Sequence, residues 1–271
     1  MLVFPNAKIN IGLRIIRRRP DGYHDLESLF CPVPWEDALE VLPAGHAVQQ
    51  GFVQTGLPLQ PGTNLVEKAR DLLAKDFDIP PLGIHLHKCI PSGAGLGGGS
   101  ADAAFALRTI NEVCKLGLDR RQLEAYAEKL GSDCPFFIRN QPCRVTGRGE
   151  FLEEAEVNLG GWHVCIVYPD VHISTAEAFA GVKPREHTDG QDLMSCLKQP
   201  VDTWKDTVVN DFEASVFPAH PVLAEIKRGL YDAGAVYASM SGSGSAVYGL
   251  FREMPADRET EFPGISKRMV L

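Results

Sequence analysis

Residues 91–104 read PSGAGLGGGSADAA, and five of these fourteen positions are glycine: Gly93, Gly95, Gly97, Gly98 and Gly99. The residues before them alternate between apolar and polar side chains, as in a strand, and the apolar residues after them recur at helical spacing. Glycine tolerates a positive φ and lets a ligand approach the backbone, while a helix N-terminus offers unpaired N–H groups and a positive dipole. A tight strand-to-helix turn needs only one or two glycines. The stretch therefore predicts a phosphate-binding loop, with a helix that begins near Ser100.

Two other phosphate loops fit these glycines less well. A Walker A loop requires a lysine after its last glycine, but Gly98 is followed by Gly99. The dinucleotide fingerprint G-x-G-x-x-G is present at Gly93, Gly95 and Gly98, and it requires a second strand that ends in an acidic residue about 20 residues later. The acid near that distance is Asp119, which caps a helical pattern and ends no strand. Both motifs are therefore disfavoured.

Composition narrows the class of protein. The chain has 271 residues, 27 basic and 35 acidic side chains, a formal charge of −8, and 44% apolar residues. These values exclude a disordered chain and allow one large domain or two ordinary ones. No apolar run reaches the roughly 18 residues of a membrane helix, and the N-terminus has no signal-peptide pattern. The seven cysteines form no C-x-x-C pair, so we expect reduced thiols in a cytoplasmic protein. The net negative charge argues against nucleic-acid binding.

The first strand of the chain is predicted by strict alternation over residues 7–14. Its apolar side chains fall on one face, and Lys8 and Asn10 lie side by side on the other. This period is typical of a half-buried strand. After a turn, residues 23–30 are also predicted to be extended.

Capping signals place several helices. Predicted capping boxes join Asn64 to Glu67 and Asp119 to Gln122, and Pro221 begins a further helix. A further strand is predicted at residues 163–168. A hairpin is predicted from strands at residues 236–240 and 246–251, which the sequence SGSGS connects.

The glycine loop and five other blocks resemble the GHMP kinases, a superfamily of small-molecule kinases. The blocks occur in order and span nearly the whole chain: PNAKINIGL (5–13), RRPDGYHDLESLF (18–30), the loop, LGSDCPFF (130–137), GRGE (147–150) and SGSGSAVYGLF (241–251). The first two, with the loop, resemble the members that act on a cytidine diphosphate conjugate. The resemblance implies an α+β, two-domain GHMP kinase fold, with a ribosomal protein S5 domain 2-like N-terminal domain and a ferredoxin-like C-terminal domain. Because the sequence changes character near residue 150, we place these domains at residues 1–155 and 156–271.

The same resemblance implies ATP-dependent phosphorylation of a hydroxyl on that conjugate, with ATP and Mg²⁺ as cofactors. Lys8 and Asp133 correspond to the family's catalytic pair. Asp133 would accept the proton of the substrate hydroxyl or orient it, and Lys8 would hold Asp133 ionised and offset charge on the transferring phosphoryl group. From the residues alone, Lys8 could be a solvated strand lysine and Asp133 a helix cap. The ATP-binding positions implied are Pro91, Ser92, Gly93, Ala94, Gly95, Leu96, Gly97, Gly98, Gly99, Ser100 and Ala101.

Substrate recognition is implied by the same family pattern. Its tyrosine and a later phenylalanine hold the cytosine ring between their faces, and its histidine reads the base edge; these correspond to Tyr23, Phe179 and His24. Thr175 stands four residues before Phe179, at the family's spacing, and Asn10 is expected to bond a substrate hydroxyl. Without the family, Tyr23 could pack in the turn and Phe179 in the core.

Several features stay open at the level of sequence. The arginines at residues 17–19 fit either a solvated basic run or a diphosphate contact. The SGSGS loop, residues 241–245, either supports the glycine loop or closes over the substrate. His85 and His87 share a strand face without a third ligand, so we expect surface histidines, and no D-x-D cluster marks the Mg²⁺ ligands. Cys134 is expected to be inert.

We expect a small-molecule substrate, no nucleic-acid or membrane partner, and a monomer or weak homodimer. Two alternatives stay open: another GHMP kinase, of the homoserine or mevalonate type, and a nucleotide-binding protein without catalysis. The G-Y-H block with Phe179 argues against the first. The pair of Lys8 and Asp133 argues against the second.

Overall fold

The computed structural model describes residues 1–43, 51–58, 64–182, 184, 192–255 and 262–271. Its contacts divide the chain into two compact units, neither of which is continuous in sequence. The first unit comprises residues 1–7, 35–92 and 97–141, and the second comprises residues 8–34, 93–96 and 142–271. The glycine loop changes unit twice, because residues 93–96 belong to the second unit and their flanks to the first. The predicted domain division at residue 155 stays a prediction.

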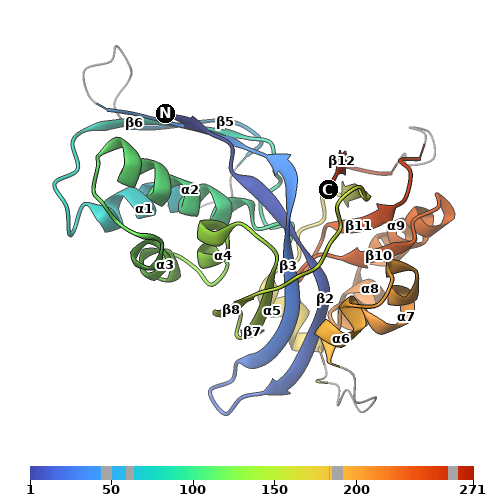
Figure 1. Ribbon diagram of the computed structural model, residues 1–271. Helices are drawn as coiled ribbons and strands as arrows, with labels where there is room; N and C mark the ends of the chain where they lie inside the picture. The colour runs from blue at the N-terminus through green and yellow to red at the C-terminus, as the bar shows by residue number, and fades with distance from the viewer. Residues whose placement is uncertain (44–50, 59–63, 183, 185–191, 256–261) are drawn as a thin grey trace. The chain divides into compact units, whose positions relative to one another are not determined.

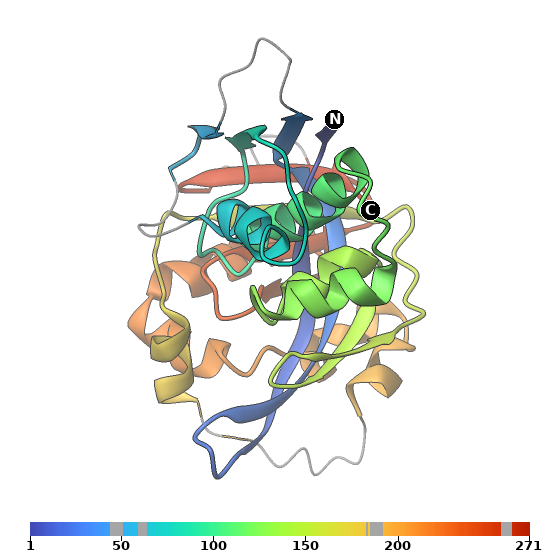
Figure 2. The ribbon, with the colours of Figure 1, turned by 90° about the vertical axis from the view of Figure 1, so that its left-hand side faces the viewer.

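The first unit is a four-stranded sheet with helices on one face. The strand order is β1-β4-β6-β5, with β5 parallel to β6 and the other neighbours antiparallel. Figure 1 and Figure 2 both show α1 and α2 on the same face of this sheet. The strands are β1 (Leu2–Val3), β4 (Ala38–Pro43), β5 (Gly51–Gly56) and β6 (Leu82–Lys88), and the helices are α1 (Leu65–Leu73), α2 (Gly98–Val113), α3 (Arg120–Glu128) and α4 (Cys134–Arg139).

Side-chain caps begin two of these helices where the sequence predicts them. Asp119 accepts the N–H of Gln122, and the Gln122 side chain accepts the N–H of Asp119, each at 2.9 Å, so this capping box is confirmed. Asn64 caps α1 by accepting the N–H of Val66 at 2.7 Å, not that of Glu67 as the capping box requires. Helix α2 begins two residues before the predicted start, because the last glycines of the loop already have helical backbone.

The second unit contains two further four-stranded sheets, β2-β3-β7-β8 and β10-β11-β9-β12. Helix α9 packs on β10 and β11, and its apolar stripe is buried as predicted. The strands are β2 (Asn6–Arg18), β3 (His24–Glu36), β7 (Cys143–Gly147), β8 (Phe151–Glu154), β9 (His163–Tyr168), β10 (Tyr237–Met240), β11 (Val247–Phe251) and β12 (Ile265–Val270). The helices are α5 (Thr175–Gly181), α6 (Leu193–Leu197), α7 (Trp204–Thr207), α8 (Glu213–Ala219) and α9 (Pro221–Asp232), with a 3-10 turn at Val201–Thr203. Among the helices of the described ranges, we find none that combines the length and the apolarity needed to cross a membrane.

Most of the predicted strands of this unit are confirmed. Strand β9 has the predicted bounds, and β10 pairs with β11 in the predicted antiparallel hairpin. Strands β7, β8 and β12 are not predicted from the sequence. Strand β12 is mostly exposed and is added to the sheet through its backbone pairing with β9, so its side chains carry little apolar alternation.

Strand β2 is correctly predicted as a strand, but the prediction that it is half-buried is wrong. Its two faces are both buried from Asn6 to Ile15, and the polar residues Lys8, Asn10 and Arg14 are only 3%, 2% and 2% exposed. Alternation shows that the two faces of a strand differ in polarity. Whether the polar face meets water or protein depends on the tertiary fold. Since buried polar groups are almost always hydrogen-bonded, the partners of these side chains indicate what the strand does.

Candidate active site

The glycine loop has the backbone that its sequence predicts. Gly93, Gly95 and Gly97 have φ angles of +69°, +77° and +72°, a region that other residues rarely adopt. Gly97 is the N-cap of α2, and within the described residues no side chain caps this helix. The first N–H groups of α2 are therefore left for a ligand, and together with the helix dipole they form an anion site.

The carbonyl groups of residues 94–96 all accept hydrogen bonds within the second unit. The backbone N–H of Ala246 donates to the first of them at 3.0 Å, and the backbone N–H of Lys8 donates to the third at 2.9 Å. The carbonyl of Gly95 accepts twice, from Lys8 Nζ at 3.0 Å and from Ser241 Oγ at 2.8 Å. The SGSGS loop therefore supports the glycine loop, which is the first of the two roles predicted for it.

Lys8 is a buried residue, so the alternative of a solvated strand lysine is wrong. Its Nζ donates to Asn10 Oδ1 at 2.5 Å and lies 4.5 Å from the centroid of the Phe30 ring. Asn10 in turn donates from Nδ2 to Ser28 Oγ at 2.9 Å. A buried ammonium group is unfavourable unless it is bonded, and these contacts hold it in one position. Asn10 thus orients Lys8, while its bond to a substrate hydroxyl stays a prediction.

Asp133 stands at the N-cap position of α4, in the first unit, and is half-buried. Its backbone is helical, at φ −84° and ψ −14°, and its side chain makes no capping hydrogen bond, so the alternative of a helix cap is wrong. Its pairing with Lys8 stays a prediction, since the two residues belong to different units. Burial raises the pKa of the neighbouring Cys134 thiol to about 12, which keeps this thiol protonated and unreactive at neutral pH.

Two of the residues predicted to recognise the base lie against each other in the second unit. The rings of His24 and Phe179 stack with their centroids 5.0 Å apart and their planes 21° apart. Tyr23 is 58% exposed, and the guanidinium group of Arg148 lies 5.0 Å from the centroid of its ring. Tyr23 is therefore not buried in the turn. Arg148 is a contact that sequence reasoning missed, although the GRGE block that contains it was recognised.

Helix α5 positions Phe179. Ser174 caps the helix by accepting the N–H of Glu177 at 3.1 Å, and Thr175 is the exposed first helical residue. Phe179 follows one turn later and packs edge to face on Phe212, with the ring centroids 4.8 Å apart. Phe179 thus packs partly in the core, which is the alternative that the sequence left open for it. It also stacks on His24, the histidine of the predicted base site.

Two of the three consecutive arginines pair with one carboxylate. Arg17 and Arg19 donate to Asp25 at 2.6 and 3.0 Å. Arg18 is exposed. Partial burial, together with the charge of Arg18, lowers the pKa of His24 below its usual 6.5, so this imidazole is neutral at pH 7. Arg17 and Arg19 therefore form ion pairs with Asp25 near the turn. A contact between these arginines and a diphosphate stays a prediction.

A buried ion cluster in the first unit was missed by sequence reasoning. Lys88, at the end of β6, donates from Nζ to Asp37 Oδ2 and, at 2.7 Å, to Asp102 Oδ2. The three residues are each 2% exposed or less. Asp102 lies within residues 91–104, the glycine-rich stretch. Asp37 is 51 residues from Lys88, and no sequence-spacing rule connects Asp37 with Lys88 or Asp102.

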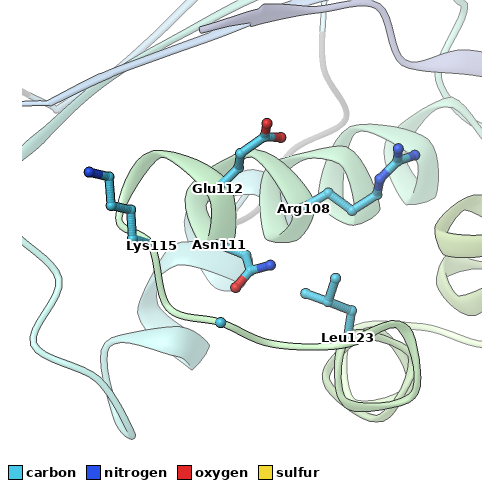
Figure 3. A pocket seen from close by; sticks show the side chains of 6 residues that line it. Arg108, Asn111, Glu112, Lys115 and Leu123 are labelled. Carbon is cyan, nitrogen blue, oxygen red and sulfur yellow. The ribbon is translucent and has the colours of Figure 1, made fainter.

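A surface hollow of about 360 Å³ lies beside the C-terminal half of α2 (Figure 3). Its Asn111 holds the backbone of Leu118, donating to the carbonyl at 3.1 Å and accepting the N–H at 2.9 Å. Asn111 is roughly 20 Å along the helix axis from Gly98, since each residue rises 1.5 Å. The hollow is therefore separate from the glycine loop. Its lining residues are Arg108, Asn111, Glu112, Lys115, Gly117 and Leu123.

The histidines of β6 do not form a metal centre with other side chains of the described part of the chain. His85 Nδ1 lies 3.6 Å from a carboxylate oxygen of Glu40, and His87 Nδ1 is hydrogen-bonded to Thr55 Oγ1 at 2.9 Å. Within the described ranges, no group of three His, Cys, Asp or Glu side chains is placed to hold a metal ion. Both histidines are at least partly exposed, as predicted.

Comparison with known proteins covers nearly the whole chain. The family models described as GHMP kinases N terminal domain and GHMP kinases C terminal match residues 64–141 and 194–262. The 4-diphosphocytidyl-2-C-methyl-D-erythritol kinase of Bacteroides thetaiotaomicron is 51% identical over 265 residues, which are 97% of this chain and 96% of that protein. A crystal structure of 4-(cytidine 5'-diphospho)-2C-methyl-D-erythritol kinase is similar with a TM-score of 0.78 at 33% identity, over 92% of this chain and 90% of that one. The homoserine kinase of Cytophaga hutchinsonii has a TM-score of 0.62 at 15% identity, over 94% of this chain and 86% of that one.

These similarities confirm the predicted α+β, two-domain GHMP kinase fold. At 15% identity the homoserine kinase is similar in fold alone. The fold therefore does not distinguish kinases that act on different alcohols, and that distinction depends on the residues of the site.

Proposed function

Because the chain belongs to the 4-diphosphocytidyl-2-C-methyl-D-erythritol kinases, a family of the GHMP superfamily, we propose that it transfers the γ-phosphoryl group of ATP to the 2-hydroxyl of the methylerythritol part of that substrate. The products are the 2-phosphate and ADP. The reaction is a step of the non-mevalonate route to isopentenyl diphosphate. The protein is thus a small-molecule kinase whose acceptor is an alcohol.

ATP binding is assigned to the glycine loop, residues 91–101. Support comes from the three positive φ angles of the loop and from the uncapped N–H groups at the start of α2. These N–H groups and the helix dipole favour the negative charge of the phosphates. The bonded carbonyl groups of residues 94–96 reduce the repulsion that free carbonyl oxygens would exert on an anion.

Transfer of a phosphoryl group requires positioning and neutralisation of charge more than covalent help from the protein. In this proposal, Asp133 accepts the proton of the attacking 2-hydroxyl or holds that hydroxyl in line. Lys8 offsets the negative charge that develops on the transferring group and keeps Asp133 ionised. The hydrogen bond from Lys8 to Asn10 and its burial support this role, because a fixed ammonium group needs no reorganisation during the reaction.

The observation that carries the cytidyl specificity is the aromatic group of the second unit. The exposed face of Tyr23 can stack on a flat pyrimidine, and a neutral His24 can hydrogen-bond the edge of the base. Phe179, stacked on His24, supplies the second aromatic face. Homoserine and mevalonate have no ring that could use these contacts, so this group favours a cytidine conjugate as the substrate.

Purified protein can be assayed with ATP, Mg²⁺ and one alcohol at a time, following the release of ADP. We expect release with the cytidyl substrate and none with homoserine or mevalonate. Release with homoserine or mevalonate alone would overturn the proposed substrate. Binding of ATP without release in any of the three reactions would favour the alternative of a nucleotide-binding protein without catalysis.

Mg²⁺ is expected to accompany ATP. This ion usually keeps several waters and takes phosphate oxygens as ligands, so it needs few protein side chains. We assign the hydroxyl of Ser100, in the first turn of α2, to this ion, either directly or through a water. A cytoplasmic location and a monomer or weak homodimer complete the proposal.

A further inference from the structure

The backbone of Asn10 is held by two side chains from the C-terminal part of the second unit. Asn10 lies on β2, which stands at the edge of its sheet. Its N–H donates to Ser241 Oγ at 3.2 Å, and its carbonyl accepts from the hydroxyl of Tyr248 at 2.8 Å. Both partners are fully buried. The position of Asn10 on the strand is therefore set, and what remains is the direction of its amide group.

The amide of Asn10 lies between two groups of different chemistry. Its Oδ1 is 2.5 Å from Lys8 Nζ, and its Nδ2 is 2.9 Å from Ser28 Oγ. An ammonium group can only donate hydrogen bonds, so Lys8 requires the amide oxygen on its side. A hydroxyl group can donate or accept. What Ser28 requires therefore depends on where its own proton goes.

The hydroxyl proton of Ser28 is already used in another bond. Ser28 Oγ lies 2.7 Å from the carbonyl oxygen of Gly12. Because a carbonyl oxygen has no proton, the hydroxyl must be the donor in this bond. Towards Asn10 the same hydroxyl can then only accept, which requires an amide N–H on that side. Lys8 and Ser28 thus impose the same direction on the amide from its two ends.

The three hydrogen bonds form one directed chain that leads away from Lys8. Lys8 donates to Asn10, and Asn10 donates to Ser28. The Ser28 hydroxyl donates to the main chain at Gly12, so the chain crosses from β2 to β3 and returns to β2. Hydrogen bonds in such a chain polarise and strengthen one another. Because the chain ends on a backbone carbonyl, it ties the ammonium group to a fixed point of the strand.

Strand β3 contacts the ammonium group of Lys8 at a second point, through the ring of Phe30. The centroid of this ring lies 4.5 Å from Lys8 Nζ. Ser28 and Phe30 are two residues apart on β3, so their side chains share one face of the strand. Ser28 is fully buried, so bulk water is not at hand to replace it as the acceptor for Asn10.

We propose that Ser28 is a positioning residue of the kinase reaction, which anchors the amide of Asn10 and thereby holds the ammonium group of Lys8 in place for phosphoryl transfer. The inference rests on the proposed role of Lys8 in the transfer. A charge stabilises a transition state best when it is in position before the reaction begins. Without the Ser28 hydroxyl, a buried N–H of Asn10 loses its acceptor, and the amide turns toward another one. Its oxygen then leaves Lys8.

Ser28→Ala removes the anchor and keeps Lys8, Asn10 and the glycine loop. In steady-state assays of ADP release with the cytidyl substrate, we expect kcat to fall roughly tenfold to a hundredfold, the equivalent of one hydrogen bond to a charged group. The KM for ATP and the KM for the cytidyl substrate should each change by less than about threefold, because the N–H groups of α2 and the base site are not part of the chain of bonds.

Ser239→Ala is the matched control. Ser239 lies in the same unit, is 1% exposed and donates from Oγ to Glu213 Oε1 at 3.1 Å. Its removal should lower the urea midpoint, as the removal of Ser28 should, and leave kcat unchanged. A merely structural Ser28 predicts that Ser28→Ala behaves in the same way as this control.

A double-mutant cycle tests whether Ser28 acts through Asn10. In Asn10→Asp, either oxygen of the carboxylate can accept from Lys8, so no anchor is needed to aim an oxygen at the ammonium group. In this background, Ser28→Ala should lower kcat by less than about threefold. An equal loss in both backgrounds would show that Ser28 does not act through the Asn10 amide, and would overturn the inference.

A kcat for Ser28→Ala within about threefold of the wild type would also overturn the inference, while leaving the proposed function intact. If Ser28→Ala does not fold, NMR of the wild type decides. The side-chain amide protons of Asn10, assigned by their loss in Asn10→Asp, should show nuclear Overhauser contacts to the β protons of Ser28. Contacts to the ε protons of Lys8 in their place would overturn the inference. A wild type that releases no ADP with the cytidyl substrate overturns the proposed function and this inference with it.

Discussion

Replacing Gly95 by alanine tests whether the backbone geometry of the loop, beyond its composition, makes the site. At a φ of +77° an alanine is strained by roughly 1–2 kcal/mol. Its Cβ would also stand 2.0 Å from the carbonyl oxygen of Ser241 and 3.1 Å from that of Gly244. These are backbone atoms that cannot rotate away as a side chain can, so the loop or the SGSGS segment must move, by about 1.5 Å, to reach an ordinary contact distance.

A movement of that size breaks the two hydrogen bonds at the Gly95 carbonyl. The bond from the charged Lys8 contributes about 1.5–3 kcal/mol and the bond from Ser241 about 0.5–1.5 kcal/mol. With the backbone strain, the total is about 3–6 kcal/mol. If half of this free energy is lost as stabilisation of the catalytic transition state and half as stability of the folded protein, kcat/KM falls roughly tenfold to a hundredfold.

The assay combines steady-state release of ADP with denaturation in urea, and Gly99→Ala is the matched control. A Cβ at Gly99 would meet Leu65 Cδ1 at 3.8 Å, an ordinary contact, and alanine in a helix is favoured over glycine by about 0.5–1 kcal/mol. We expect Gly95→Ala to unfold at lower urea than the wild type and Gly99→Ala at equal or higher urea. A Gly95→Ala protein with the wild-type urea midpoint and a kcat/KM within about threefold of the wild type would refute the reasoning.

Three further outcomes follow from the site. Asp133→Ala should lose most of kcat and still bind ATP in a nucleotide-binding assay; near-normal turnover would remove Asp133 from the reaction. Tyr23→Ala should raise the KM for the cytidyl substrate by the equivalent of about 1–3 kcal/mol, with little effect on the KM for ATP, and an unchanged substrate KM would reject base stacking. Because the pKa of His24 is lowered below 6.5, its neutral form persists on acidification. The substrate KM should therefore stay constant from pH 8 to 6.5 and rise only below that, which a pH series compared with His24→Asn can check.

The features that the sequence predicted well are those set by local backbone chemistry. A loop that needs positive φ at Gly93, Gly95 and Gly97 can be recognised because few residues other than glycine adopt that geometry. The capping box of Asp119 with Gln122 is likewise local, since both hydrogen bonds form within one helical turn. Such signals need no knowledge of the rest of the fold.

The features that could not be predicted depend on contacts between distant segments. Alternation placed Lys8 and Asn10 on a polar face, but only the folded chain shows that this face is buried. The cluster around Lys88 joins Asp37, 51 residues before it, to Asp102, 14 residues after it. A single charged residue is normally exposed, so a sequence indicates a buried charge only when its partner is also known.

A phosphate loop has two electrostatic requirements. One is met by the local sequence, and the other by contacts with distant segments of the chain. The N–H groups must face the anion, which glycines followed by a helix achieve locally. The carbonyl groups must be bonded elsewhere, and for Gly95 this is done by Lys8, 87 residues away, and by Ser241, 146 residues away. Lys8 thus acts on the loop before any substrate arrives, so its removal would disturb ATP binding and phosphoryl transfer together. Asp133 is proposed to act on the attacking hydroxyl and not on the nucleotide, so Asp133→Ala tests the chemical step separately from ATP binding.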